Sequence, residues 1–199
     1  MDQIRDDVID TVQNHWERLL VDDFVEIVER HHADDEHGVE YDLVEEYFDD
    51  LAARADFDVG PMREQFEERL TDDQSFADEH AVYEVGEDRV SAYPLEFHEA
   101  LDEGGSLADL VAAMTASMDD TAGSAAAAGV PEDGVVNAGS AILGTDRTEI
   151  RTRLEDLASE GELEIEASQH PRSGVSLAED ADVEEEGLDR PESDDRSSE

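Results

Sequence analysis

Residues 134–178 constrain the fold of this chain more than any other stretch. Within them, Ile150, Leu154 and Leu157 recur at i, i+4 and i+7. This spacing places the three side chains on one stripe of a helix, which is typical of a helix that packs one face against a core. The stretch therefore predicts an amphipathic helix near its middle.

The residues around this helix predict a turn before it and two short strands after it. Asp146 stands where an N-cap is expected, and Gly161 supplies the residue type that commonly ends a helix. Leu163 and Ile165 then alternate with glutamates, and this period of two is typical of a strand. A polar loop at residues 168–174 turns the chain before the alternation resumes. The predicted order is helix, tight turn, helix and two strands.

This order of elements resembles the winged helix-turn-helix family, whose usual work is DNA binding. In that family the second helix of the motif enters the major groove, and the loop between the strands contacts the flanking backbone or the minor groove. With about 100° per residue, Thr148 and Thr152 point away from the apolar stripe, and arginines lie on both sides of them. The resemblance implies the following DNA-binding residues: Thr145, Arg147, Thr148, Arg151, Thr152, Arg153, His170 and Arg172.

The residue types on this face suit contacts with bases and phosphates. Arginine pairs with guanine N7 and O6, and threonine contacts bases, phosphates or a thymine methyl. Arg147 and Arg151 lie at i and i+4, so they repel each other unless an anion lies between them. Thr145 and the free amides at the helix start could hold a phosphate. Glu155 does not fit, because it projects near the same face and would either pair with Arg151 or repel phosphate.

The charge of the whole chain opposes DNA binding. The sequence has 58 acidic residues against 13 basic ones, all of them arginine, and a formal net charge of −45. Periodic apolar residues run through most of the chain, which excludes disorder as the general explanation. Because the acidity is spread over every segment, we expect an intracellular protein of an extreme halophile. Molar salt shortens the Debye length to about 3 Å and screens the repulsion, but it also weakens the gain from counterion release.

Two functions from different classes therefore stay open. The first is a DNA-binding protein, a transcriptional regulator that acts through its C-terminal unit. The second is a non-enzymatic adaptor that binds proteins of the replication, transcription or chromosome-maintenance machinery. A contiguous patch of Arg147, Arg151, Arg153 and Arg172 would favour DNA, whereas arginines that each contact a neighbouring carboxylate would favour the adaptor.

Residues 1–40 are expected to form an N-terminal helical segment. An apolar stripe runs along residues 1–32 without proline or glycine, and the acids after Val21 could break it. One long helix and two packed helices both fit this pattern. The stripe could bury against its own domain or against a partner subunit, and the second arrangement would make a homodimer through this helix.

The rest of the chain predicts a mainly α fold with small β-hairpins, built from two winged-helix-like units in tandem. Residues 41–101 predict helix, turn, helix and hairpin, but their second helix is mostly acidic, so we expect it to serve packing or protein contacts. Residues 104–178 hold the C-terminal winged helix-turn-helix, with an insertion or flexible loop at residues 119–133. Residues 179–199 lack the apolar content to pack and should form a disordered acidic tail.

Several other classes of site are excluded or disfavoured. The chain has no cysteine, which rules out disulfides, thiolate nucleophiles and cysteine-ligated zinc. Three histidines gather among acids at residues 31–38, but we expect a polar loop there and no metal site. No serine elbow, phosphate loop or paired-histidine helix motif is present, so we expect neither an enzyme nor a cofactor. The acidic N-terminus and the lack of an apolar run of ~20 residues predict a soluble, cytoplasmic protein without a membrane partner.

Overall fold

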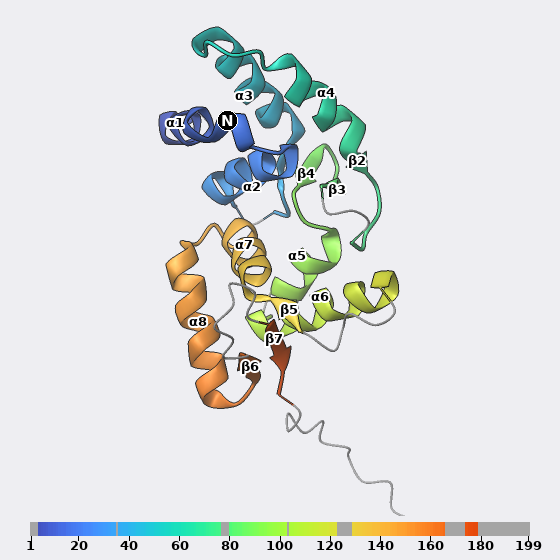
Figure 1. Ribbon diagram of the computed structural model, residues 1–199. Coiled ribbons are helices and arrows are strands. Elements are labelled where there is room, and N and C mark those ends of the chain that lie inside the picture. The colour runs from blue at the N-terminus through green and yellow to red at the C-terminus, as the bar shows by residue number, and fades with distance from the viewer. Residues whose placement is uncertain are drawn as a thin grey trace, which may run out of the picture.

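The computed structural model describes residues 4–34, 36–76, 80–102, 104–122, 129–165 and 174–178. Within these ranges the chain is mainly helical, and its short strands form two small sheets. Figure 1 shows two units stacked one above the other, with the N-terminal unit in blue to green and the C-terminal unit in green to red. A search of the described helices finds none with the length and apolar character needed to span a bilayer.

The first unit joins helices to a four-stranded sheet. Its strands lie in the order β1-β4-β3-β2, in which β4 is antiparallel to both of its neighbours and β2 is parallel to β3. Its elements, in chain order, are α1 (Asp6–His15), the 3-10 turn η1 (Trp16–Arg18), α2 (Val21–His32), β1 (Val39–Glu40), α3 (Tyr41–Arg54), α4 (Gly60–Arg69), β2 (Leu70–Thr71), β3 (Val82–Gly86) and β4 (Arg89–Ser91).

The apolar stripe of the N-terminal segment is buried inside this first unit. The stripe belongs to two helices, because the backbone is extended at Leu20 and an Asp23 carboxylate oxygen accepts a hydrogen bond from the Leu20 amide at 3.1 Å as α2 begins. Val12 and Phe24 are 0 % exposed, and the Phe24 ring lies 4.7 Å from that of Phe48 on α3. Since the stripe is covered by its own chain, the observation that suggested a dimer through this segment has another explanation.

The second unit has its own core and its own three-stranded sheet. The strands lie in the order β5-β7-β6 with both pairs antiparallel. Val136 and Ile150 from two different helices are 0 % exposed at its centre. The elements are α5 (Leu95–Leu101), α6 (Leu107–Ala122), β5 (Val130–Pro131), α7 (Glu132–Ile142), α8 (Arg147–Glu160), β6 (Leu163–Ile165) and β7 (Gly174–Leu177).

The two units repeat one order of elements. In the first unit it runs α2-β1-α3-α4-β3-β4, with the additional strand β2 between α4 and β3, and in the second it runs α6-β5-α7-α8-β6-β7. In both sheets the first of these strands pairs with the last, as Val39 does with Val90 and Val130 with Val175. The prediction of simple hairpins was therefore incomplete, because β1 and β5 are each two residues long and too short to show a period.

The units divide the chain at positions other than those expected from the sequence. The segment at residues 1–40 supplies α2 and β1, which belong to the first unit and not to a separate N-terminal piece. Phe97 of α5 is 3 % exposed within the second core, although residues 41–101 were expected to end with this helix. Within residues 119–133, expected as a loop, α6 continues to Ala122 and β5 pairs with β7. The expected acidic tail at residues 179–199 lies outside the described residues.

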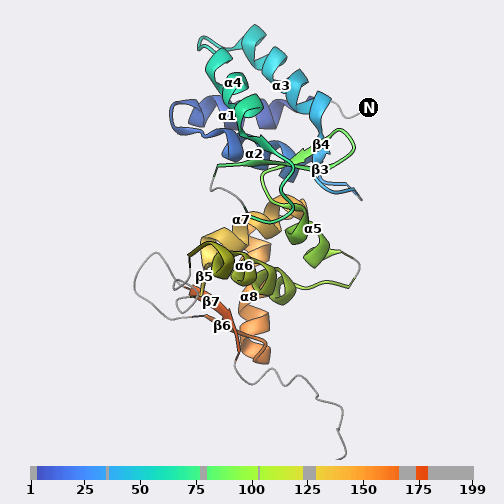
Figure 2. The same cartoon turned by 90° about the vertical axis from the view of Figure 1, so that its right-hand side faces the viewer.

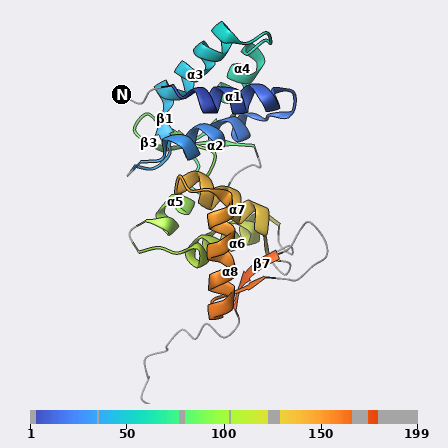
Figure 3. The same ribbon diagram turned by 90° about the vertical axis from the view of Figure 1, so that its left-hand side faces the viewer.

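The units meet where α2 of the first packs against α7 of the second, as Figures 1 and 3 both show. In Figure 2, α5 lies between the first sheet and α6, and α5 contacts both β3 and α6. A close approach between the units involves the turn after α7. A Cβ on Gly144 would lie 2.7 Å from the Cβ of Ala33 and 3.5 Å from the carbonyl oxygen of Arg30. The contact therefore requires a residue without a side chain.

Gly144→Ala should reduce the free energy of unfolding more than Gly161→Ala. Both glycines have positive φ, +57° and +83°, so alanine at either position costs about 1–2 kcal/mol of backbone strain. At position 144 the new methyl group also presses on α2, and overpacking of this kind adds about 1–3 kcal/mol. Urea unfolding in molar potassium chloride would measure both losses. Equal losses would contradict a tight contact between this turn and the first unit, since nothing lies within 4 Å of a Cβ at position 161.

Candidate functional sites at helix α8 and at the junction of the units

Helix α8 forms at the predicted position, with one side buried and the other exposed. Asp146 accepts a hydrogen bond from the Thr148 amide at 2.7 Å, and this bond lowers the pKa of the Asp146 carboxyl. Gly161 ends the helix in the left-handed conformation with φ +83°. Ile150 and Leu154 are 0 % and 1 % exposed, so they form the expected inward stripe.

Each arginine of α8 contacts a carboxylate. Arg147 donates to Glu26 of the first unit at 2.7 Å. On the other turns of the helix, a guanidinium nitrogen of Arg151 lies 3.0 Å from Asp133 of α7, and one of Arg153 lies 2.6 Å from Glu149. The pairs of Arg151 and Arg153 are exposed, and exposed pairs contribute only about 0–1 kcal/mol, so these two arginines can exchange partners. A phosphate would nevertheless have to displace a carboxylate at each arginine.

The threonine hydroxyls of the predicted site bond to nearby groups. Thr145 donates to the Leu143 carbonyl at 3.1 Å, and Thr152 donates to the Thr148 carbonyl at 3.0 Å. The Thr148 side chain bonds to Asp146. The remaining two predicted residues, His170 and Arg172, lie outside the described residues. The structure thus gathers six of the eight predicted residues on or beside the start of one helix.

The exposed side of α8 carries both signs of charge. Glu155, the residue that did not fit a DNA-reading face, is exposed on the same helix. It does not hold Arg151, which contacts the acids at the start of α7 instead. The N-terminus of α8 also lies beside the first unit, because the Gly144 turn packs on α2 and Arg147 reaches Glu26. This face is therefore a mixture of arginines, acids and threonines next to a second unit.

The corresponding helix of the first unit, α4, has no free arginine at its centre. Arg63 lies 2.6 Å from Asp49 and 3.2 Å from Glu45, both on α3. Its guanidinium lies 5.5 Å from the centre of the Phe48 ring, and the hydrogen bond with Asp49 raises its pKa. The other charges of α4 are mostly acidic, which suits the expected role in packing or protein contacts.

The three histidines at residues 31–38 form hydrogen bonds with three different partners. His31 lies 2.7 Å from the Ile27 carbonyl, His32 lies 2.6 Å from the Tyr47 hydroxyl, and His37 lies 2.9 Å from Asp102. In the part of the chain that the structure describes, no group of three or more His, Cys, Asp or Glu side chains could hold a metal ion.

The junction between the units is organised around the Glu26 carboxylate of α2. Glu26 is 7 % exposed. It accepts hydrogen bonds from the Tyr93 hydroxyl at 2.9 Å and from Arg147 at 2.7 Å, while Arg30 lies 3.7 Å away. Burial and the neighbouring carboxylate raise the pKa of Tyr93 well above 10.0. One acidic side chain thus joins α2, the segment after β4 and the start of α8.

A second carboxylate, Glu29, is buried one helical turn further along α2. It is 1 % exposed and accepts hydrogen bonds from the Ser91 hydroxyl at 2.9 Å and from the Ala92 amide at 3.3 Å. Nε2 of His98 lies 2.9 Å from the Ser91 hydroxyl and 3.4 Å from Glu29. Burial raises the pKa of Glu29 to about 8 and lowers the pKa of His98 to about 3. At neutral pH the carboxyl is therefore protonated and the imidazole is neutral.

The sequence does not single out these junction residues. Glu26 and Glu29 interrupt an otherwise apolar run on α2, and acids at such positions are a weak sign of a buried polar contact. Their partners Ser91, Tyr93 and His98 lie in the stretch from the end of β4 into α5, which has no motif. Only the packing of α2 against that stretch brings them together.

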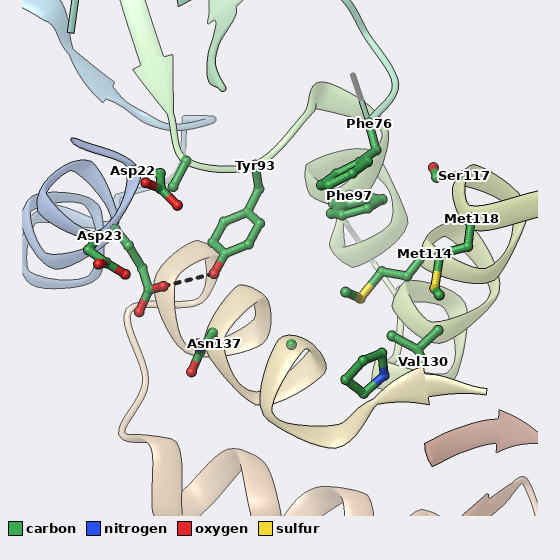
Figure 4. Close-up of a pocket in the computed structure, with 14 residues that line it drawn as sticks. Asp22, Asp23, Phe76, Tyr93, Phe97, Met114, Ser117, Met118, Val130 and Asn137 are labelled. Atoms are coloured by element: carbon green, nitrogen blue, oxygen red, sulfur yellow. Dashed lines mark hydrogen bonds between the residues drawn. The ribbon is translucent and has the colours of Figure 1, made fainter. Parts of the chain in front are cut away.

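A cavity of about 480 Å³ opens beside this junction (Figure 4). Side chains from α2, from the segment that joins the two units, and from α6 and α7 form its walls. Figure 4 shows Tyr93 between the acids of α2 on one side and Phe97 and Met114 on the other. Its size falls in the range of small-molecule sites, roughly 300–1,000 Å³.

Comparison of the chain with family models, with curated proteins and with solved structures found no match.

The free energy of unfolding should fall as the pH rises above 6.5, and Glu29→Gln should remove part of this fall. The pKa of Glu29 is about 8 in the fold against 4.5 for an ordinary glutamate. Between these values the folded state holds a proton that the unfolded state has released, so this contribution is complete below pH 4.5 and is lost as the pH rises toward 8. The loss is about 1.4 kcal/mol per pH unit. Urea unfolding of both proteins between pH 6.5 and 8 would compare the slopes.

His98→Gln provides the matched variant on the acid side. Burial lowers the pKa of His98 from 6.5 to about 3, so the unfolded state binds a proton that the folded state excludes. This contribution is complete above pH 6.5 and is lost as the pH falls toward 3. His98→Gln should therefore reduce the loss of the free energy of unfolding below pH 6.5 and leave its dependence on pH above 6.5 unchanged. If Glu29→Gln left the change of the free energy of unfolding with pH above 6.5 unaltered, Glu29 would not be the group that holds a proton in the folded state.

Proposed function

We propose that this chain is a non-enzymatic protein-interaction adaptor built from two winged-helix units in tandem. The repeated order of elements supports the two units. Each contains, in chain order, a helix, a strand, two helices and two strands, with the first of these strands paired to the last, and the first unit has the extra strand β2. A winged helix-turn-helix has this order of elements, and in such a unit α8 would correspond to the recognition helix.

The observation that carries the adaptor proposal is the pairing of every α8 arginine with a carboxylate. Arg147, Arg151 and Arg153 contact Glu26, Asp133 and Glu149 respectively. A DNA duplex offers a dense row of phosphates, and affinity for it comes largely from cations that are free to replace counterions. Guanidiniums that already contact carboxylates gain less from a phosphate, while the acids around them repel it.

The surroundings of α8 also favour a protein partner. Winged-helix proteins insert the N-terminal part of this helix into a groove about 12 Å wide. Here that end lies beside the first unit, because the Gly144 turn approaches Ala33, the residue after α2. A surface of mixed charges on a rigid helix suits a protein partner of complementary pattern, since charge pairs across an interface mainly set specificity and association rate.

A photoreactive amino acid at position 152 should crosslink the chain to a protein in the cells that produce it. Thr152 is exposed at the centre of the α8 face, so a bound partner would lie within reach. The adduct should be sensitive to protease and insensitive to nuclease, and Arg151→Glu should reduce its yield several-fold by reversing a charge on the face. Electrophoresis of the adducts after each treatment provides the measurement.

Position 68 provides the control for this experiment. Glu68 is exposed on α4 of the first unit, so a photoreactive residue there tests a different surface of the same chain. The protein that crosslinks to the photoreactive residue at position 152 should not crosslink to one at position 68. A nuclease-sensitive adduct at position 152 would overturn the adaptor proposal in favour of nucleic-acid binding.

DNA binding through α8 is the second candidate, and one observation favours it. Thr148, Arg151, Thr152 and Arg153 are all exposed on α8, away from its buried stripe. The pairs that hold the arginines are themselves exposed, and high salt weakens exposed pairs. A halophilic DNA-binding protein would then depend on base contacts more than on net charge.

If α8 reads DNA, Arg151→Ala should weaken binding at the preferred site by about 1–3 kcal/mol and leave folding intact. The arginine side chain is exposed, so its removal leaves the core unchanged. Genomic fragments retained by the protein in molar potassium chloride would define the site, and titration of the two proteins would give the affinities. Absence of any retained fragment with a folded sample would eliminate the regulator hypothesis, and an unchanged affinity would remove Arg151 from the contact face.

A further inference from the structure

The cavity at the junction has an acidic end and an apolar end. Asp22, Asp23 and Glu26 of α2 line one side of it. Figure 4 shows Phe76, Phe97 and the two methionines on the opposite side, with Tyr93 and Asn137 between. The described residues that line it are Asp22, Asp23, Glu26, Phe76, Ala92, Tyr93, Phe97, Met114, Ser117, Met118, Val130, Pro131, Gly134 and Asn137.

The acidic end carries more negative charge than its surroundings neutralise. Glu26 is already paired with Arg147 and Arg30, neither of which lines the cavity. Asp22 and Asp23 add two further carboxylates, and no arginine occurs among the described residues of the lining. The side chain of Asp22 is 20 % exposed, and screening by salt is weaker for a group that is largely buried.

One oxygen of Asp22 lacks a hydrogen bond. Its Oδ2 lies 3.2 Å from Nδ1 of His80, whereas its Oδ1 is buried without a hydrogen-bond partner among the described residues. An acceptor left unsatisfied away from water costs free energy. The chemistry of this end therefore suits an N–H donor with a positive charge.

The apolar end suits a hydrocarbon body. Phe97 is 3 % exposed, but Phe76 is 37 % exposed and is one of the few large apolar side chains of the described residues that face solvent. Met114 and Met118 on α6 provide flexible, polarizable walls that adapt to the shape of a ligand. A ligand body placed here would cover apolar surface that water now contacts.

We propose that this cavity binds an amphipathic organic cation, with an amine or guanidinium group at the carboxylates of α2 and an aromatic or branched apolar body between Phe76, Phe97 and the methionines of α6. The walls come from both units, so a bound cation joins them and stabilises the arrangement in which α2 packs on α7. This site goes beyond the adaptor proposal and does not depend on which macromolecule α8 contacts.

The test uses 4-phenylbutylamine as the probe and two compounds that each lack one half of its chemistry. 4-Phenylbutanol keeps the apolar body without the charge, and methylammonium keeps the charge without the body. Isothermal titration calorimetry of the full chain in molar potassium chloride should show saturable binding of the amine. Its affinity should exceed that of the alcohol by about tenfold or more, as for close charge pairs in a partly buried site. Methylammonium should bind more weakly still, by about fourfold for each methylene that the body buries.

Gly134→Leu should abolish this binding without loss of stability. Gly134 lines the cavity on α7, and a Cβ there would lie 3.6 Å from the Met114 methyl group, an ordinary contact. A leucine would fill the space, and leucine favours a helix more than glycine does. Thermal unfolding of the variant would show that it folds. Amine binding that persists in Gly134→Leu would overturn the site.

Two further substitutions separate the roles of the two ends. Asp22→Asn should reduce the preference for the amine over the alcohol several-fold. Phe76→Ala should weaken both ligands about threefold to tenfold, while Leu177→Ala, which removes another exposed apolar side chain, should leave the affinities unchanged. Equal affinities of the amine and the alcohol for the wild-type chain would overturn the cationic specificity.

Discussion

The arrangement of the two units depends on two carboxylates that α2 carries on its buried side. Burying a charge costs free energy unless the group is paired or neutralised. Glu26 is paired with Tyr93 and two arginines, whereas Glu29 keeps a proton because burial raises its pKa to about 8. The partners come from both units and from the segment that connects them. The contact of Glu26 with Arg147 forms only when the units pack as they do, whereas Glu29 accepts its hydrogen bonds from Ser91 and Ala92 at the end of β4.

The same contacts decide what α8 offers to a partner. Arg147, a residue expected on a DNA-reading face, donates a hydrogen bond to Glu26 at the junction and so contacts the first unit. The chain has 58 acidic and 13 basic residues, so most arginines have carboxylates within reach. Arg151 and Arg153 form ion pairs with Asp133 and Glu149. The proposed adaptor role follows from this competition, because any phosphate must replace an existing contact before it gains one.

The cavity arises from joining two units through one main pair of helices. α2 and α7 approach closely at the Gly144 turn, where a side chain would not fit. Beside that contact, the segment carrying Tyr93 and Phe97 passes from one unit to the other and α6 lies opposite α2, so space remains between them. A ligand in this space would contact residues of both units, so its binding would depend on how the units are placed relative to each other. The proposed cation site rests on this arrangement.

The sequence by itself determined the local elements of this protein. α8 begins after Asp146 and ends at Gly161 because capping and left-handed termination depend on neighbouring residues, and its buried stripe follows from the spacing of Ile150 and Leu154. Only the tertiary structure decided where the units divide, how β1 and β5 join their sheets, and what surrounds Glu26. Two residues are too few to show a period, and Tyr93 and Arg147, which donate hydrogen bonds to Glu26, lie 67 and 121 residues away in the chain, so no local pattern relates them. Their proximity is a consequence of packing α2 against α7.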